Sequence, residues 1–101
     1  MQARFLEPAE AEIEEAIVYF DDQREGLGER FERDLIDTVA FLVERPQAGK
    51  PLSKHVRKFP LRRFRYNVIY LVDGDEVVIV AVAHHRRRPG YWSGRISTAR
   101  R

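Results

Sequence analysis

The period of the apolar residues changes near the middle of the chain, and this change constrains the fold more than any other feature. Residues 8–44 carry apolar side chains three and four positions apart, as on one face of a helix. Residues 55–85 carry them in alternation or in one continuous run, as in strands. Because 101 residues are enough for one domain only, the helices and the strands must share a core.

The helical half divides into two helices, over residues 8–23 and 27–44. Pro8 suits a first helical turn, where its missing N–H is not needed. On its exposed side, the second helix pairs Arg30 with Asp34, and Arg33 with Asp37, four residues apart. Two amphipathic helices with a short joint predict a helical hairpin. Their apolar stripes are Ile13, Ala16, Ile17 and Phe20 in the first helix and Leu27, Phe31, Leu35, Val39 and Leu42 in the second.

The other half contains three candidate strands, over residues 55–61, 63–72 and 76–85, after a loop at 46–54. A short extended segment at residues 4–6 opens the chain. The last strand is apolar on both faces, so we expect it to be covered on both sides. In the middle strand, alternation places Phe64, Tyr66, Val68, Tyr70 and Val72 on one face and Arg65, Asn67, Ile69 and Leu71 on the other.

These elements predict an α+β fold of order β-α-α-β-β-β, with the helical hairpin packed on one face of a mostly antiparallel sheet. Residues 1–101 form a single domain in this prediction, and residues 96–101 form a disordered tail. The chain contains no cysteine, no signal-peptide pattern and no apolar run of membrane-spanning length. We therefore expect a cytoplasmic protein.

Charge is distributed unevenly between the two halves. Residues 1–50 hold 6 Lys and Arg against 13 Asp and Glu, a net charge of −7, whereas residues 51–101 hold 12 against 3, a net charge of +9. One explanation is that acidic helices and a basic sheet stabilise each other. The other is a basic surface that binds a polyanion, or a protein that handles one.

Nine cationic side chains lie within 39 residues of the second half. Antiparallel pairing of the last two strands brings Arg63 and Arg65 toward Arg86 and Arg87, which predicts one cationic patch from two sequence clusters. Trp92 beside this patch could stack on a base or anchor a partner, or it could fold back over the outer face of the sheet. The predicted target- or nucleic-acid-binding residues are Arg57, Lys58, Arg62, Arg63, Arg65, Arg86, Arg88, Trp92 and Arg95.

Two histidines, His84 and His85, end the last strand beside three arginines. Alternation places them on opposite faces, so at most one can serve a given active face. Histidine exchanges protons near neutral pH, but packing at the end of the strand or a hydrogen bond to the backbone also explains the pair. Nothing in the sequence has the spacing of a metal site, a phosphate-binding loop or a serine nucleophile. We expect neither a metal nor a cofactor.

Three stretches carry a family resemblance: Arg63-Phe64-Arg65-Tyr66-Asn67-Val68-Ile69-Tyr70, the hairpin Asp73-Gly74-Asp75, and residues 80–92 with their ending Pro89-Gly90-Tyr91-Trp92. Together with the element order, they resemble the RelE/ParE superfamily over about residues 3–95. The resemblance implies the toxin of a plasmid-stabilisation type II toxin–antitoxin pair.

This superfamily has two mechanistic branches. RelE-like toxins are described as ribosome-dependent endoribonucleases that cut messenger RNA, and that branch would assign catalysis here to His84, Arg87 and Tyr91. ParE-like toxins lack the nuclease residues and block DNA gyrase. The present chain has Asn67 where RelE-like toxins carry an arginine, and it lacks their repeated lysines. The resemblance is therefore closer to the ParE-like branch.

Both branches imply a cognate antitoxin. We expect an antitoxin segment to cover the helical-hairpin groove and the basic face, with apolar anchors at helical spacing and acidic residues for the arginines. The expected target is DNA gyrase, or the ribosome and its message in the RelE-like alternative. A nucleic-acid-binding module without toxicity is the remaining alternative.

Overall fold

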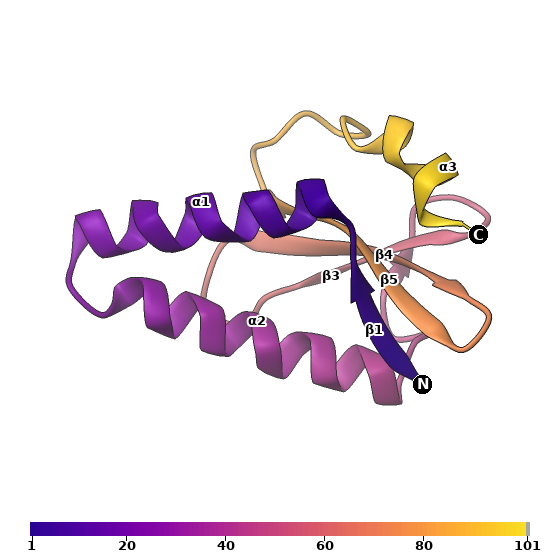
Figure 1. Ribbon diagram of the computed structural model, residues 1–101, viewed down its shortest axis with the longest axis horizontal. Helices are drawn as coiled ribbons and strands as arrows, with labels where there is room; N and C mark the ends of the chain where they lie inside the picture. Colours follow the sequence, from indigo (N-terminus) through magenta and orange to yellow (C-terminus); the bar gives the residue numbers. More distant parts are fainter. Residues whose placement is uncertain (101) are drawn as a thin grey trace.

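A computed structural model describes residues 1–100 and shows a helical hairpin against a five-stranded sheet (Figure 1). Strand β1 and two long helices come first, and four strands and a short C-terminal segment follow. The α+β fold predicted from the sequence is confirmed. The elements are β1 (Gln2–Phe5), α1 (Glu7–Gln23), α2 (Leu27–Glu44), β2 (Lys50–Pro51), β3 (Val56–Pro60), β4 (Tyr66–Asp73), β5 (Glu76–His84), the 3-10 turn η1 (Ser93–Arg95) and α3 (Ile96–Ala99).

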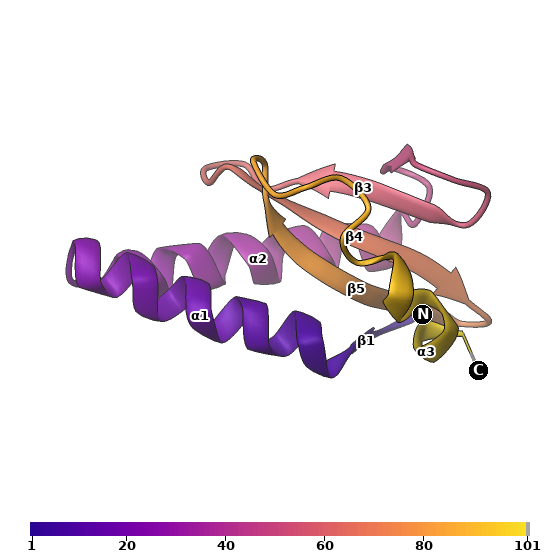
Figure 2. The same cartoon turned by 90° about the horizontal axis from the view of Figure 1, so that it is seen from above.

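The sheet has the order β1-β5-β4-β3-β2. Strand β1 runs parallel to β5, and the other three pairs are antiparallel. Figures 1 and 2 show the hairpin of α1 and α2 on one side of the sheet and the segment after β5 on the other. The last long strand is thus internal and covered on both faces, as its sequence predicted.

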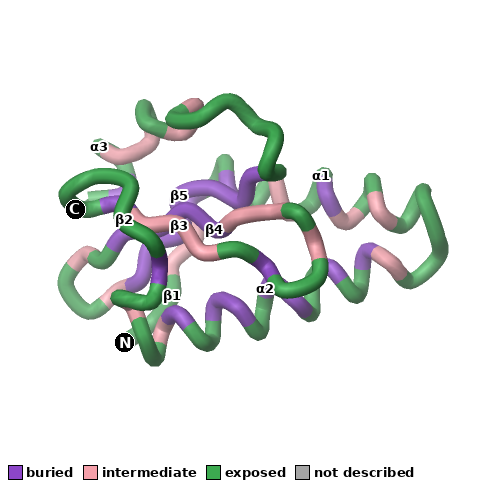
Figure 3. Tube along the Cα trace, turned by 180° about the vertical axis from the view of Figure 1, so that it is seen from behind, coloured by how far each residue is buried: buried purple, intermediate pink, exposed green. Residues whose placement is uncertain are grey.

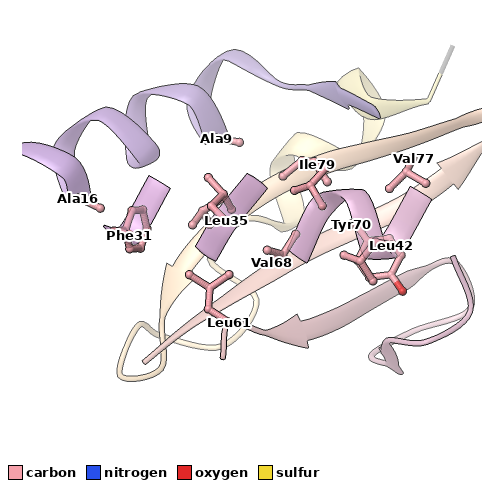
Figure 4. Close-up of a cluster of buried hydrophobic side chains, with 12 residues drawn as sticks. Ala9, Ala16, Phe31, Leu35, Leu42, Leu61, Val68, Tyr70, Val77 and Ile79 are labelled. Atoms are coloured by element: carbon pink, nitrogen blue, oxygen red, sulfur yellow. The ribbon is translucent and has the colours of Figure 1, made fainter. Parts of the chain in front are cut away.

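The main core lies between the helical hairpin and the sheet (Figure 4). The stripe of α2 supplies Phe31, Leu35 and Leu42, which meet Val68 and Tyr70 of β4. Each large apolar side chain that is fully buried contributes about 1.5–3 kcal/mol. The alternating positions of β4, Ile69 and Leu71, belong to a second cluster on the outer face of the sheet. The alternation therefore predicted correctly which of these side chains of β4 face the helices and which face outward.

A β-bulge in β5 reverses that alternation for the last part of the strand. Tyr70 pairs with Ile79 and Ile69 pairs with Ala81, so Val80 is an extra residue. Val80 and Ala81 both belong to the outer cluster, whereas Val82 returns to the helix side. The bulge therefore decides which residues at the end of β5 face the helices.

Close contact between the two helices depends on Gly28. A Cβ atom at this position would lie 2.5 Å from the backbone oxygen of Ile17, which is too close for any real side chain. The backbone N–H of Gly28 also donates to the Asp21 carboxylate at 2.8 Å. The absence of a side chain at Gly28 thus allows α2 to pack closely against α1.

Several sequence predictions need correction. Strand β4 begins at Tyr66, so Arg63 and Arg65 lie in the preceding turn and not in the strand. The loop predicted at 46–54 contains the edge strand β2, which is only two residues long and too short to show a period. Val72 is 43% exposed and does not join the core face of its strand.

Asp34 does not form the exposed ion pair with Arg30 that the sequence suggested. It is buried, and its two carboxylate oxygens accept the backbone N–H groups of Arg62 and Arg63 at 3.2 and 2.8 Å. The position lies three residues after Phe31, on the core side of α2. Helix α2 therefore fixes the turn that leads into β4.

The chain end also differs from the prediction of a disordered tail. Residues 96–99 form α3, and Ala99 is fully buried in the outer cluster. The guanidinium of Arg4 donates to the Ala99 carbonyl oxygen at 2.8 Å and to Glu76 at 3.0 Å. Figure 3 shows the exposed stretch after β5 passing to this docked end. Arg101 lies outside the described residues.

Replacing Asp34 with alanine tests the link between α2 and the turn. The variant leaves two backbone N–H groups without their charged acceptor, so we expect the free energy of unfolding to fall by about 2–3 kcal/mol. Urea denaturation followed by circular dichroism measures the change. Asp37→Ala, on the exposed side of the same helix, should stay within about 0.5 kcal/mol of the parent. Equal effects of the two changes would contradict the assignment.

Candidate functional site

Six exposed arginines gather where β4 begins and β5 ends. Tyr66 pairs with His84 in the sheet register, and the His85 N–H donates to the Arg65 carbonyl oxygen at 2.9 Å. The turn before β4 and the segment after β5 therefore lie side by side. We call this surface the cationic end; its members are Arg62, Arg63, Arg65, Arg86, Arg87 and Arg88.

These arginines are not consumed by neighbouring carboxylates. Five of them have a guanidinium group that forms neither an ion pair nor a hydrogen bond within residues 1–100: Arg62, Arg63, Arg65, Arg86 and Arg88. Arg87 instead stacks on the Tyr91 ring, 3.9 Å from its centroid. Most guanidinium groups of the cationic end are thus available to bind a partner. The groove that separates Arg62 and Arg63 from α2 also contains carboxylates, those of Glu29, Asp34 and Asp37.

Two of the predicted binding cations lie elsewhere on β3. Arg57 donates from its Nη1 atom to the carbonyl oxygens of Gln47 and Gly49, at 3.3 and 2.7 Å, so it braces the loop before β3. Lys58 is half-buried and lines a cleft on the outer face of the sheet. The structure therefore does not bring Arg57 into the cationic end.

Arg95 is removed from that surface by an ion pair with Glu12 of α1. Its two terminal nitrogens lie 2.9 and 3.2 Å from the Glu12 carboxylate oxygens, and its Nη1 atom also donates to the Val80 carbonyl at 3.0 Å. The Tyr91 hydroxyl donates to the same carboxylate at 2.5 Å. Glu12 thus ties two residues of the C-terminal segment to the first helix.

The geometry of β5 explains why a carboxylate is needed there. Strand β1 covers β5 only as far as Ile79, because the chain then turns into α1. Beyond that point the Val82 N–H faces no strand, and it donates to the Glu12 carboxylate at 3.1 Å. Glu12 and Arg95 together therefore satisfy an N–H and a C=O at an open strand edge.

Tyr91 cannot easily give up its proton in this position. Burial raises the pKa of its hydroxyl most, and the hydrogen bond to Glu12 raises it further. Arg87 and Arg95 nearby lower the pKa, but the balance leaves it far above the ordinary value of 10.0. The residue that the nuclease alternative would use is therefore held as a neutral hydrogen-bond donor.

Trp92 packs back over the outer face of the sheet, which is one of the two placements considered from the sequence. It is half-buried against the outer cluster, together with Tyr91 and Ile96. Between this tryptophan and the sheet lies a cleft of about 420 Å³, whose polar lining includes Lys58, Asn67, His85, Arg87 and Arg88.

The two histidines have different surroundings. The His84 ring meets Tyr66 edge-on at 5.3 Å, and its Nδ1 atom accepts the Arg86 N–H at 3.0 Å. A neutral His84 in this arrangement carries its proton on Nε2. His85 lines the cleft on the outer face, which His84 also reaches from the end of β5. Among residues 1–100, no group of histidines and carboxylates has the arrangement of a metal site.

Glu12 is the main residue that the sequence analysis overlooked. The apolar stripe alone described the first helix in the sequence, although Glu12 lies three residues after Ala9 and four before Ala16, both of which are buried. A carboxylate on a buried stripe requires a partner. The position of Glu12 between two alanines on the same face of the helix is the sequence feature that could have identified it.

No helix of the described part of the chain has both the length and the apolar character that crossing a bilayer requires.

A family model described as "ParE toxin of type II toxin-antitoxin system, parDE" matches residues 3–89. Two curated relatives from Mycobacterium tuberculosis, strains CDC 1551 / Oshkosh and ATCC 25618 / H37Rv, are named "Toxin ParE2". Each is 33% identical over 89 residues, which cover 87% of this chain and 85% of the relative.

A solved structure described as "Chromosomal ParDE TA system from P. aeruginosa" has a similar fold, with a TM-score of 0.73. The match covers 83% of this chain and 95% of the other, at 19% sequence identity. It confirms the arrangement of hairpin and sheet.

Removal of the Glu12 carboxylate should loosen the C-terminal segment. We expect Glu12→Ala to lower the free energy of unfolding by about 2–4 kcal/mol, because Arg95 and the Val82 N–H lose their acceptor. Hydrogen exchange should also rise in residues 91–100. Urea denaturation and exchange mass spectrometry measure the two effects. Glu10→Ala, an exposed change two residues earlier in the same helix, serves as the control, and a similar loss there would refute the role of Glu12.

The raised pKa of Tyr91 predicts a loss of stability in alkaline solution. A folded-state pKa above the unfolded value contributes stability that is complete below about pH 10 and is lost as the pH rises toward the folded value. Tyr91→Phe should therefore lose less stability than the parent between about pH 9 and about pH 11. Denaturation curves across this range provide the measurement. Parallel losses in the two proteins would show that Tyr91 does not contribute.

Proposed function

Because the chain belongs to the ParE toxin family of type II toxin–antitoxin systems, we propose that it inhibits growth by poisoning DNA gyrase. The resemblance to ParE-like toxins implies this target. The cationic end would supply the contact, since gyrase handles a polyanion and exposed arginines favour such a partner. Gyrase acts on chromosomal DNA, so the proposed site of action is the cytoplasm.

One observation argues against a nuclease: the Tyr91 hydroxyl and the Arg95 guanidinium both donate to the Glu12 carboxylate. Cleavage of RNA by its 2′-hydroxyl requires a proton acceptor, a proton donor and cations near the phosphate. Here the tyrosine hydroxyl already donates to Glu12, and its pKa is raised. Arg95 of the tail is neutralised by the same carboxylate.

A ribosome-dependent ribonuclease is the second candidate, and the outer-face cleft favours it. Lys58, His85, Arg87 and Arg88 line that cleft without a carboxylate among the lining residues. Histidine and cations around one cavity are the groups that phosphate cleavage uses. His84, also predicted as catalytic, reaches the same lining from the end of β5.

Membership of this toxin family implies a cognate antitoxin as partner. We propose that its neutralising segment lies on the helical hairpin and reaches the cationic end. Both helices expose large apolar side chains there: Val18 is 60% exposed, Ile36 54% and Phe41 39%. Such side chains could receive apolar anchors at helical spacing, while acidic residues meet the arginines.

A supercoiling assay with purified gyrase separates the two candidates. The toxin should inhibit supercoiling, and Arg86→Ala combined with Arg88→Ala should require about 10-fold more protein for the same inhibition. Neither guanidinium has a partner in the described structure, so the fold should persist. Lys54→Ala, in the exposed loop before β3, removes a charge elsewhere and should inhibit like the parent.

Tyr91→Phe provides the opposing test. The change keeps the ring and removes the hydroxyl, so a nuclease that depends on Tyr91 should lose message cleavage, whereas a gyrase poison should keep most of its activity. Expression in a bacterium without the antitoxin, followed by message mapping and the DNA-damage response, gives the readout. Codon-register cleavage without DNA damage would reject gyrase as the target.

A further inference from the structure

A second pocket lies on the helix side of the cationic end, between the last turns of α1 and the turn before β4. Its volume is about 360 Å³, within the range of about 300–1,000 Å³ that small-ligand sites occupy. It shares only His84 with the outer-face cleft, and neither Trp92 nor Lys58 lines it. The lining residues are Tyr19, Phe20, Arg63, Phe64, Arg65, Tyr66 and His84.

The pocket has cations but no carboxylate in its lining. Arg63 and Arg65 are exposed, and within residues 1–100 their guanidinium groups have no partner. The adjoining groove beside α2 differs in this respect, since Glu29, Asp34 and Asp37 line it with the arginines. An anion is therefore favoured in the pocket and opposed by carboxylates in the groove.

Its floor is a rigid group of aromatic rings. The ring centroid of Phe64 lies 4.9 Å from that of Phe20 and 5.3 Å from that of Phe31, and both contacts are edge-on. The ring centroids of Tyr66 and Phe31 are 5.0 Å apart. These rings belong to or pack against the main core, so they cannot move far. The pocket is thus formed in advance of any ligand.

Its rim offers an aromatic face and a hydrogen-bond donor. Tyr19 is 56% exposed, and its ring contact with Phe20 is edge-on at 5.2 Å. On the other side, the Nδ1 atom of His84 is occupied by the Arg86 N–H, which leaves Nε2 as the donor of the neutral ring. An exposed ring, two forked cations and a donor are therefore concentrated around one cavity.

We propose that this pocket binds a nucleotide unit of single-stranded nucleic acid. The phosphate lies between Arg63 and Arg65, whose guanidinium groups bind phosphate oxygens in pairs. The base stacks on Tyr19, and the Nε2–H of His84 donates to the sugar–phosphate. A nucleotide presents charge and a flat ring together, which an acidic peptide side chain does not. This inference goes beyond the proposed gyrase target and does not depend on it.

Fluorescence anisotropy of a labelled oligonucleotide tests the proposal with the full chain. The probes are oligothymidylate and oligouridylate of about 12 nucleotides, at salt from about 50 to about 200 mM. Tyr19→Ala should weaken binding about 5- to 10-fold, and Tyr19→Phe should restore it, because stacking needs the ring and not the hydroxyl. Preference for one probe distinguishes DNA from RNA as the ligand.

The arginines have their own readout. Combining Arg63→Ala with Arg65→Ala should reduce the slope of log affinity against log salt by about 0.7, the value for one neutralised phosphate on a single strand. The backbone contacts of both residues, to Asp34 and His85, do not involve the deleted groups. Lys54→Ala, which removes one positive charge outside the pocket, serves as a control and should leave the slope unchanged. It lies before β3, whose first residue pairs with Leu71, far along β4 from Tyr66.

Three outcomes would overturn the proposal. One is the absence of binding by the parent protein at the lowest salt. Another is equal weakening by Lys54→Ala and by the arginine changes, which would show a diffuse charge effect. The third is displacement of the probe by an oligoglutamate of equal charge as readily as by unlabelled oligonucleotide, which would assign the pocket to an acidic protein. Growth arrest measured on the same variants reports on the gyrase proposal separately.

Discussion

The carboxylate of Glu12 holds the outer half of this structure in place. It accepts from the Val82 N–H, the Tyr91 hydroxyl and the Arg95 guanidinium, and so joins α1, β5 and the C-terminal segment. A carboxylate is needed there because β1 ends at Phe5 and leaves the rest of β5 with an unpaired edge. A buried charge is tolerated only when it is paired, and here one pairing also satisfies the strand and fixes the tail.

The same pairing determines which cations remain available. Arg95 is neutralised by Glu12, and Arg57 is occupied by loop carbonyls. The six arginines of the cationic end lie beyond these contacts, at the end of the sheet where β4 begins and β5 ends. Paired and unpaired cations are thus separated along the sheet. Of the two explanations for the uneven charge, pairing between an acidic helix and the basic half is observed at Arg95, and the proposed binding surface would use the unpaired arginines.

The bulge at Val80 divides the end of β5 between two surfaces. Because it shifts the alternation, His84 lies against Tyr66 on the helix side, while His85 lines the outer-face cleft. The aromatic pocket and the cleft are therefore neighbours with different linings. One is built on rigid core rings beside two free arginines, and the other lies beneath Trp92 and the tail.

Local periodicity was sufficient for much of the fold. The second helix was predicted at its observed bounds, Leu27–Glu44, and the faces of β4 followed from alternation, because each depends on residues a few positions apart. The closeness of Arg65 to the segment after β5 also followed, since an Asp-Gly turn fixes the pairing of two adjacent strands.

Tertiary structure alone decided the rest. Glu12 meets Tyr91 and Arg95 across 79 and 83 residues, and Asp34 meets the backbone of Arg63 across 29. No local pattern specifies which distant groups a buried carboxylate will find. The docking of α3 depends on the same cause, because its four residues gain stability only from the sheet that they cover. The sequence by itself determined the elements and the excess of charge; the packing determined which charges are left free to act.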